Sequence, residues 1–147
     1  MKLLEGQVRI PSGCAISAVI SKEGNRMTGE KIIESMKPMH DRSNGLGGGF
    51  AGYGIYPEYR DFYALHIFYN DSICRADCEK YLKDKFEVVL AEEIPVRKIP
   101  EITDEPLIFR YFVDPLKSVL TAAQLDEKEY VARTVMKINT GFTGAYV

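Results

Sequence analysis

The stretch DFYALHIFY, residues 61–69, decides the fold class, because it predicts a strand that is apolar on both faces. The alternating positions are Tyr63, Leu65 and Ile67 on one side and Phe62, Ala64 and Phe68 on the other. A strand buried on both sides needs a layer of structure against each face of its sheet. We therefore expect a layered α+β fold with antiparallel strands.

Upstream of this strand the sequence predicts a second strand, a turn and a helix. CAISAVI (14–20) alternates small and aliphatic residues and indicates a buried strand, and a turn is expected at 23–25. Helical spacing of apolar residues predicts a helix from Thr28, as its N-cap, to about Met39. A further strand is predicted at 52–56, antiparallel to 61–69.

Downstream the pattern of helices and strands continues. Helices are predicted at 76–86 and 127–137, an extended segment at 87–91 and a strand at 107–113. Prolines at 95, 100 and 106 mark a loop-rich stretch between them. The residues at 143–147 resemble the beginning of a strand, so we expect the natural chain to continue past Val147.

Composition narrows the function classes. The chain has 147 residues, is 46% hydrophobic and 27% charged, and carries a net charge of −2, as is ordinary for one soluble globular domain. No block of like charge or long apolar run is present, so we expect no nucleic-acid partner and no membrane. Three cysteines without a secretion signal favour a reducing, cytoplasmic location.

Two cysteines could be read as metal ligands. Cys74 and Cys78 are four residues apart and would share a helix face. A zinc site needs two further ligands, and His40 and His66 do not form a second cluster. We therefore predict no metal site.

Cys14 is the candidate nucleophile. A thiol acts as a thiolate and needs a base or a lowered pKa, yet no histidine is near it in sequence. Cleavage between Gly13 and Cys14 would free an α-amine whose pKa, about 7.7–8.0, suits a general base. The alternative interpretation is a small buried thiol on a core strand.

A glycine-rich run, NGLGGGFAGYG (44–54), is the second candidate. Residues 47–52 match G-x-G-x-x-G, but the predicted order is helix, glycines, strand, which is the reverse of a dinucleotide site. The glycines more simply allow close packing of backbone near a site. Arg42 precedes them, and its simplest interpretation is a solvated residue at a helix C-terminus.

The order of these features resembles the class II glutamine amidotransferases, which are Ntn hydrolases. The resemblance begins with Cys14 opening a strand and continues through MHDRSNG (39–45) into FAGYGI (50–55). Residues 74–79, 88–96, 106–113 and 130–133 resemble the stretch peculiar to glutamate synthases, most closely the amidotransferase of the archaeal type. The resemblance covers essentially the whole chain.

This resemblance implies an αββα sandwich of antiparallel sheets, incomplete in this chain. It implies that 1–13 are a leader or propeptide and that 14–147 are the N-terminal part of the amidotransferase domain, with 73–137 as a family-specific addition. Cys14 would attack glutamine, and Arg42 and Asn44 would support the site. Ammonia would pass to a separate synthase subunit that carries FMN and iron-sulfur clusters, while this chain itself shows no cofactor motif.

The sequence also departs from the family pattern. Cys14 is followed by Ala15-Ile16-Ser17 instead of Gly-Ile-x-Gly, and the arginine turn is Asp41-Arg42-Ser43-Asn44. The substrate clamps of the family find no match before Val147, so the 147-residue chain alone is expected to be inactive. The alternative is a non-catalytic Ntn-like binding or scaffold module.

Overall fold

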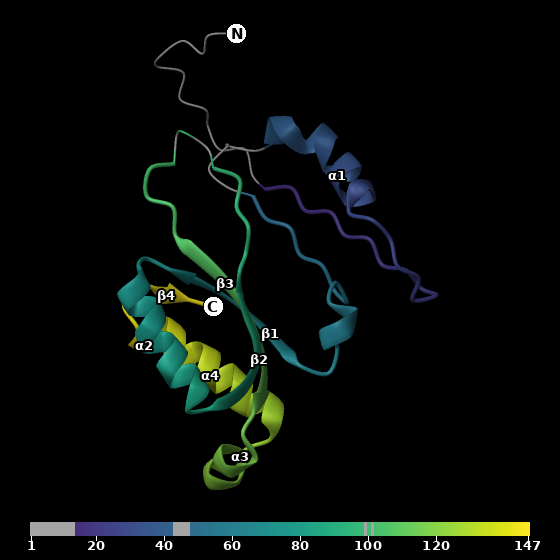
Figure 1. Cartoon of the computed structure of the whole chain (residues 1–147). Helices are drawn as coiled ribbons and strands as arrows, with labels where there is room; N and C mark the ends of the chain where they lie inside the picture. Colours follow the sequence, from purple (N-terminus) through teal and green to yellow (C-terminus); the bar gives the residue numbers. More distant parts are fainter. Residues whose placement is uncertain (1–13, 43–47, 99, 101) are drawn as a thin grey trace. The chain divides into compact units, whose positions relative to one another are not determined.

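The computed structural model describes residues 14–42, 48–98, 100 and 102–147, and for residues 40–42 the backbone alone (Figure 1). The chain divides into two compact units, Met1–Tyr53 and Gly54–Val147, which are described separately. The predicted α+β class with antiparallel strands is confirmed. In the described part of the chain no helix is long and apolar enough to cross a membrane.

The larger unit contains one four-stranded antiparallel sheet. Its strands are β1 (Tyr63–Tyr69), β2 (Phe86–Glu93), β3 (Leu107–Pro115) and β4 (Ala145–Tyr146), arranged β2-β3-β1-β4. The two central strands, β1 and β3, pair from Tyr63 to Tyr69 and from Leu107 to Val113. The strands predicted at 61–69, 87–91, 107–113 and 143–147 are therefore all confirmed within a few residues.

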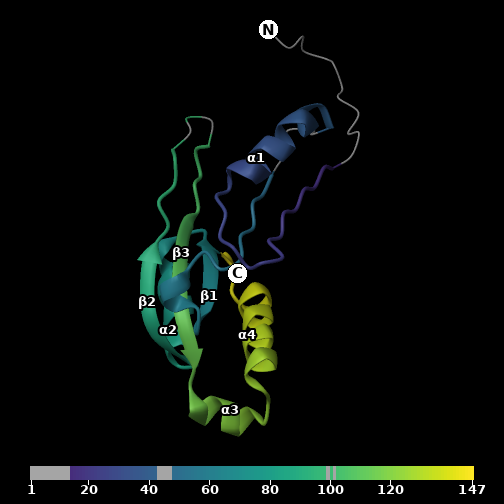
Figure 2. The same ribbon diagram turned by 90° about the vertical axis from the view of Figure 1, so that its right-hand side faces the viewer.

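Helices connect the strands in a split β-α-β pattern. The helices are α2 (Ser72–Lys83), α3 (Lys117–Ala123) and α4 (Glu127–Gly141). The sequence β1-α2-β2-β3-α4-β4 places β3 between the parallel pair β1 and β2, which is a ferredoxin-like arrangement. Figure 2 shows the sheet with α2 and α4 beside it.

Side-chain alternation explains why both helices pack on the same face of the sheet. Successive residues of a strand point to opposite faces. The buried residues of β1 and β3 are odd-numbered except for Phe112, which is buried on the other face. The core of the unit consists of Leu65, Ile67, Tyr69, Cys78, Leu82, Phe86, Phe109, Tyr111, Val113, Val131, Ile138 and Ala145. Cys78 and Leu82 come from α2, and Val131 and Ile138 come from α4.

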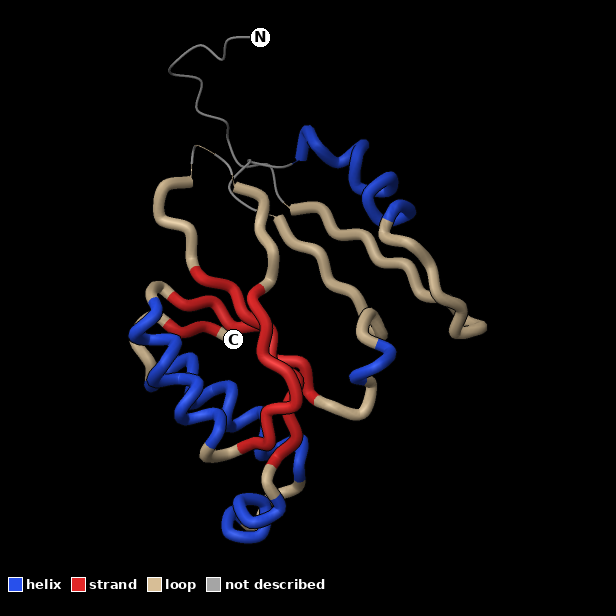
Figure 3. The backbone as a smooth tube through the Cα atoms, in the orientation of Figure 1, coloured by secondary structure: helices blue, strands red, loops and turns tan. Residues whose placement is uncertain are grey.

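The smaller unit has helix but no strand among its described residues (Figure 3). The predicted turn is present, with Gly24 at φ +69° and its N–H donating to Ser21. The helix α1 (Glu30–Met36) has Gly29 as its N-cap instead of the predicted Thr28 and continues as the 3₁₀ helix η1 (Lys37–Arg42). Pro38 accounts for the change, because proline lacks the N–H that the next α-helical bond would need.

Two predicted strands do not form. Residues 14–20 and 52–56 have no strand structure, and β1 pairs with β3 and β4 instead of with 52–56. An alternating apolar pattern specifies a strand only when a neighbouring strand satisfies its backbone groups. Among the described residues neither segment belongs to the ladder of a sheet.

The segment 73–137, predicted as a family-specific addition, shares its sheet with β1. Strand β3 lies within that segment and pairs with Tyr63–Tyr69, which lies outside it. The compact unit that contains both strands begins at Gly54, so it includes 19 residues that precede the segment 73–137. Another short 3₁₀ helix, η2 (Pro57–Tyr59), precedes β1 in this unit.

Candidate functional site

The predicted nucleophile Cys14 is exposed and lies at the start of an extended segment of the smaller unit. It is not the buried core thiol of the alternative interpretation, since its side chain faces solvent. Among the described residues its sulfur has no hydrogen-bond partner. The position therefore offers an accessible thiol and leaves its activation to groups that the described residues do not provide.

The other two cysteines are poor nucleophiles. Cys78 is buried in the core, and burial raises the pKa of its thiol to about 11. Burial and the nearby Asp71 also raise the pKa of Cys74, whose sulfur donates to the carbonyl oxygen of Thr143 at 3.3 Å. Because thiolate is the reactive form, both cysteines are expected to react slowly at neutral pH.

Helix α1 brings two segments of the smaller unit together. A hydrogen bond of 2.7 Å from the Ser35 hydroxyl to the Ser17 hydroxyl joins the segment 14–20 to the helix. A Cβ atom on Gly29 would lie 3.2 Å from the Cζ atom of Phe50, so the residues after the glycine run cover the beginning of the same helix. Cys14 and the end of the glycine-rich run therefore share one helical support.

The surroundings of the Arg42 and Asn44 side chains are not described by the structure. Arg42 is the last residue of η1, but its side chain lies outside the described part of the structure. Asn44 lies outside the described residues. Their supporting roles at the Cys14 site remain predictions.

The face of the sheet opposite the helices carries a polar cluster that sequence reasoning missed. Tyr56 Oη lies 2.8 Å from His66 Nε2, and the Arg110 guanidinium lies 4.6 Å from the Tyr56 ring centroid. Arg110 Nε donates to Glu92 at 2.9 Å and its Nη2 contacts the same carboxylate. We call Tyr56, His66, Glu92 and Arg110 the open-face cluster.

Burial and charge set the protonation of this cluster. Burial, and secondarily the Arg110 charge, lower the pKa of His66 below 6.5. His66 is therefore neutral at pH 7 and can share a hydrogen bond with the Tyr56 hydroxyl. Since Glu92 neutralises Arg110, the members of the cluster satisfy one another, which fits a structural role on the sheet.

Aromatic rings extend the cluster along the same face. Tyr59 stacks on Phe112 with ring centroids 3.9 Å apart, and Tyr56 meets Phe112 edge-on at 5.0 Å. The other end of the face is less covered, with Phe68 44% and Tyr146 52% exposed. The signal in the sequence was the even-numbered set of His66, Arg110 and Phe112, which alternates with the residues of the core cluster on β1 and β3.

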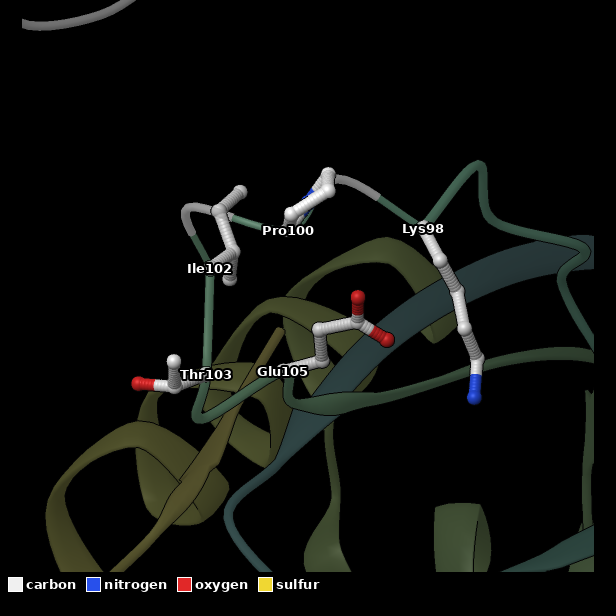
Figure 4. Close-up of a pocket in the computed structure, with 5 residues that line it drawn as sticks. All are labelled: Lys98, Pro100, Ile102, Thr103 and Glu105. Carbon is white, nitrogen blue, oxygen red and sulfur yellow. The ribbon is translucent and has the colours of Figure 1, made fainter.

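A hollow in the β2–β3 loop is the remaining candidate. It is lined by Lys98, Pro100, Ile102, Thr103 and Glu105 (Figure 4). All five residues belong to one connecting loop, and residues 99 and 101 of that loop lie outside the described part. The described residues also contain no group of three His, Cys, Asp or Glu side chains placed to hold a metal ion.

Comparison with known proteins finds an archaeal relative of similar sequence. The chain is 46% identical over 136 residues to an uncharacterized protein of Archaeoglobus fulgidus. The match covers 91% of this chain and 36% of the relative, so the chain spans about a third of that protein. No family model and no solved structure matches the chain.

Proposed function

We propose that this chain is the nucleophile-bearing part of a class II glutamine amidotransferase that serves a glutamate synthase in the cytoplasm. The observation that carries the proposal is the exposed Cys14 at the start of an extended segment held on helix α1. The resemblance in residue order supports it. Glutamine would be the substrate and ammonia the product passed on.

The chemistry begins with release of the Cys14 α-amine by cleavage after Gly13. The amine would take the thiol proton while the sulfur attacks the carbon of the glutamine amide. The amine would then protonate the leaving nitrogen, so that ammonia departs and a thioester with the sulfur remains. Water would hydrolyse the thioester to glutamate and restore the thiol. A separate synthase subunit, with FMN and iron-sulfur clusters, would use the ammonia.

A non-catalytic binding or scaffold module is the second candidate. It is favoured by the isolation of Cys14, whose sulfur contacts no polar partner among the described residues. The groups with which the family binds its substrate find no match in this chain. Loss of even a single oxyanion donor lowers the rate of an enzyme by roughly 10²–10³. The two candidates therefore differ in whether Cys14 reacts with a glutamine analogue faster than an ordinary thiol does.

The glutamine analogue diazo-oxo-norleucine tests the proposal because the site must bind it as glutamine before it alkylates the nucleophile. We expect the 147-residue chain by itself to react no faster than free cysteine. A protein that begins at Cys14 and also carries the part of the Archaeoglobus relative outside the match is expected to be labelled at Cys14. Peptide mass mapping identifies the labelled residue.

Two variants serve as controls. Cys14→Ala should abolish labelling, whereas Cys74→Ala, which removes a thiol of raised pKa, should leave it unchanged. Retention of 1–13 should also block labelling, because the α-amine would be held in a peptide bond. Equal labelling of Cys74 and Cys14, or no labelling of the longer processed protein, would contradict the amidotransferase and favour the scaffold module.

A further inference from the structure

A short segment of the larger unit lies over one end of the sheet face that carries no helix. Residues 54–60 lead to β1 as loop and the 3₁₀ helix η2 (Figure 3). Within this segment only Tyr56 and Tyr59 are half-buried, and the other five residues are exposed. We call residues 54–60 the strap. Its attachment to the sheet depends on the side chains of these two tyrosines.

Phe112 is the residue that the strap covers. It is 1% exposed, although it lies on the face of the sheet opposite the helices. The Tyr59 ring stacks on the Phe112 ring with centroids 3.9 Å apart, and the Tyr56 ring meets it edge-on at 5.0 Å. Aromatic pairs at these separations are favourable contacts. Movement of the strap away from the sheet would therefore uncover Phe112.

A hydrogen bond connects the strap to a titratable side chain of β1. Tyr56 Oη lies 2.8 Å from His66 Nε2. A neutral imidazole accepts a hydrogen bond at its unprotonated nitrogen, whereas a protonated imidazole is a donor at both nitrogens. The bond from the Tyr56 hydroxyl to Nε2 therefore requires a neutral His66 ring.

The groups that face His66 oppose a proton on its ring. Arg110 of β3 stands directly opposite His66 in the strand pairing, and Glu92 of β2 is engaged by Arg110. From the strap, the group that faces the ring is the Tyr56 hydroxyl. Burial, and secondarily the Arg110 charge, lower the pKa of His66. A proton on His66 is therefore bound more weakly while the strap is in place than it would be in water.

Gly54 gives the strap a hinge at its first residue. Its φ of +69° lies in the left-handed region, which glycine adopts without steric cost. Residues at the ends of elements commonly absorb the backbone rotations of a moving segment. The strap can therefore turn about Gly54 while β1 stays in the sheet.

We propose that the strap is a proton-controlled latch, which lies on Phe112 while His66 is neutral and lifts from the sheet when His66 takes up a proton. Lifting brings the ring into water, and a proton shifts an equilibrium toward the state that binds it more tightly. The glycine-rich run 44–54 ends at the hinge, so the lifted state also releases the C-terminal end of that run. The latch is independent of the amidotransferase proposal, because it involves no reaction of Cys14.

Hydrogen–deuterium exchange of the 147-residue chain at pH 7 and pH 5 tests the latch. The Tyr59 and Phe62 amides donate to the Tyr56 and Tyr59 carbonyls, and a single helical turn does not persist in water without its anchors. After correction for the intrinsic effect of pH on exchange, both amides should exchange about threefold or more faster at pH 5. The amides of β3 report opening of the whole unit and should change by a smaller factor.

Three variants separate the latch from a general loosening of the unit. His66→Gln can still accept the Tyr56 hydroxyl but takes up no proton, so its strap amides should have equal corrected rates at both pH values. His40→Gln should respond to pH like the parent. Tyr56→Phe keeps a ring against Phe112 without the hydroxyl, and its strap should exchange about threefold or more faster already at pH 7.

Three results would each overturn the proposal. The first is an equal acceleration of the strap and β3 amides in the parent at pH 5. The second is a pH response of His66→Gln that matches that of the parent. The third is a Tyr56→Phe strap that exchanges at pH 7 as slowly as the parent's, because the hydroxyl would then hold nothing in place.

Discussion

A chain of buried hydroxyls ties the sheet to helix α2. Tyr69 Oη donates to Tyr111 Oη at 3.1 Å, and Tyr111 Oη donates to Glu79 at 2.9 Å. Arg75 lies 3.2 Å from the same Glu79 carboxylate and its guanidinium covers the Phe109 ring at 4.3 Å. Burial raises the pKa of both tyrosines, so they remain protonated donors throughout the ordinary pH range.

Removing the middle hydroxyl should therefore destabilise the larger unit. We expect Tyr111→Phe to lower the free energy of unfolding by about 1–3 kcal/mol, because the buried Tyr69 hydroxyl loses its oxygen acceptor and keeps only the weaker sulfur partner Cys78. Urea denaturation followed by circular dichroism measures the change. Tyr146→Phe is the matched control, since Tyr146 is half exposed and should change stability by less than about 0.5 kcal/mol. Equal effects of the two variants would show that the network contributes nothing.

His66 makes the stability of the same unit depend on pH. Its pKa in the folded protein lies below the ordinary 6.5, because burial and Arg110 disfavour the charged ring. The unfolded chain therefore binds a proton more readily than the folded one. Stability from this group is fully present above about pH 6.5 and is lost as the pH falls from there through the lower folded pKa.

The expected result is a urea midpoint that falls more between pH 7 and pH 5 for the parent than for His66→Gln, which cannot take up this proton. Glutamine can still bond the Tyr56 hydroxyl, so the variant keeps the geometry while removing the titration. His40→Gln replaces the other histidine and should behave like the parent. A parent and His66→Gln with the same dependence on pH would rule out this effect.

At the scale of elements, capping decides where helices begin. The α2 helix was predicted from residue 76, yet it starts at Ser72 because the Asp71 side chain accepts a bond from the Cys74 amide at 2.8 Å. The α4 helix starts where it was predicted, with Asp126 accepting from Glu129 at 3.1 Å. Both caps satisfy amides that have no partner within the helix.

Asp71→Ala should lower the stability of the larger unit by about 0.5–2 kcal/mol, the usual cost of losing an N-cap side chain. Asp77→Ala on the exposed side of the same helix should have a much smaller effect. Thermal unfolding of both variants measures the difference. If the two substitutions lower the melting temperature equally, loss of charge and not loss of the cap is responsible.

At the scale of the whole molecule, the two units differ in how their residues are buried. All residues of the hydrophobic core lie between Leu65 and Ala145, in the unit that begins at Gly54. The described residues of the other unit include none that is buried. Cooperative unfolding depends on a shared core, so we expect the larger unit to dominate the unfolding transition.

Limited proteolysis checks this expectation. Trypsin should cut first at exposed basic residues of the smaller unit, among them Lys22, Arg26 and Lys31, and should leave a resistant product that retains 63–147. Mass spectrometry identifies the product. Early cleavage within α2 or α4, at a rate matching that in the smaller unit, would contradict the difference in stability.

The sequence alone determined the α+β class and most elements of the larger unit. The strands predicted at 61–69 and 107–113 and the helix predicted at 127–137 came from alternation and helical spacing, which are local properties, and the structure has them at Tyr63–Tyr69, Leu107–Pro115 and Glu127–Gly141. It also identified Cys14 as a candidate nucleophile, whose role stays a prediction together with those of Arg42 and Asn44.

Tertiary structure decided the remainder. It left 14–20 and 52–56 without strand structure, because a strand needs partners for its backbone that are distant in sequence. It also brought His66 and Glu92 opposite Arg110, because the pairing of β1, β2 and β3 aligns residues that lie 44 and 18 positions apart, and Tyr56 joins them through its hydroxyl. Periodicity can place each of these residues on a face, but only strand order and register determine which residues on that face become neighbours.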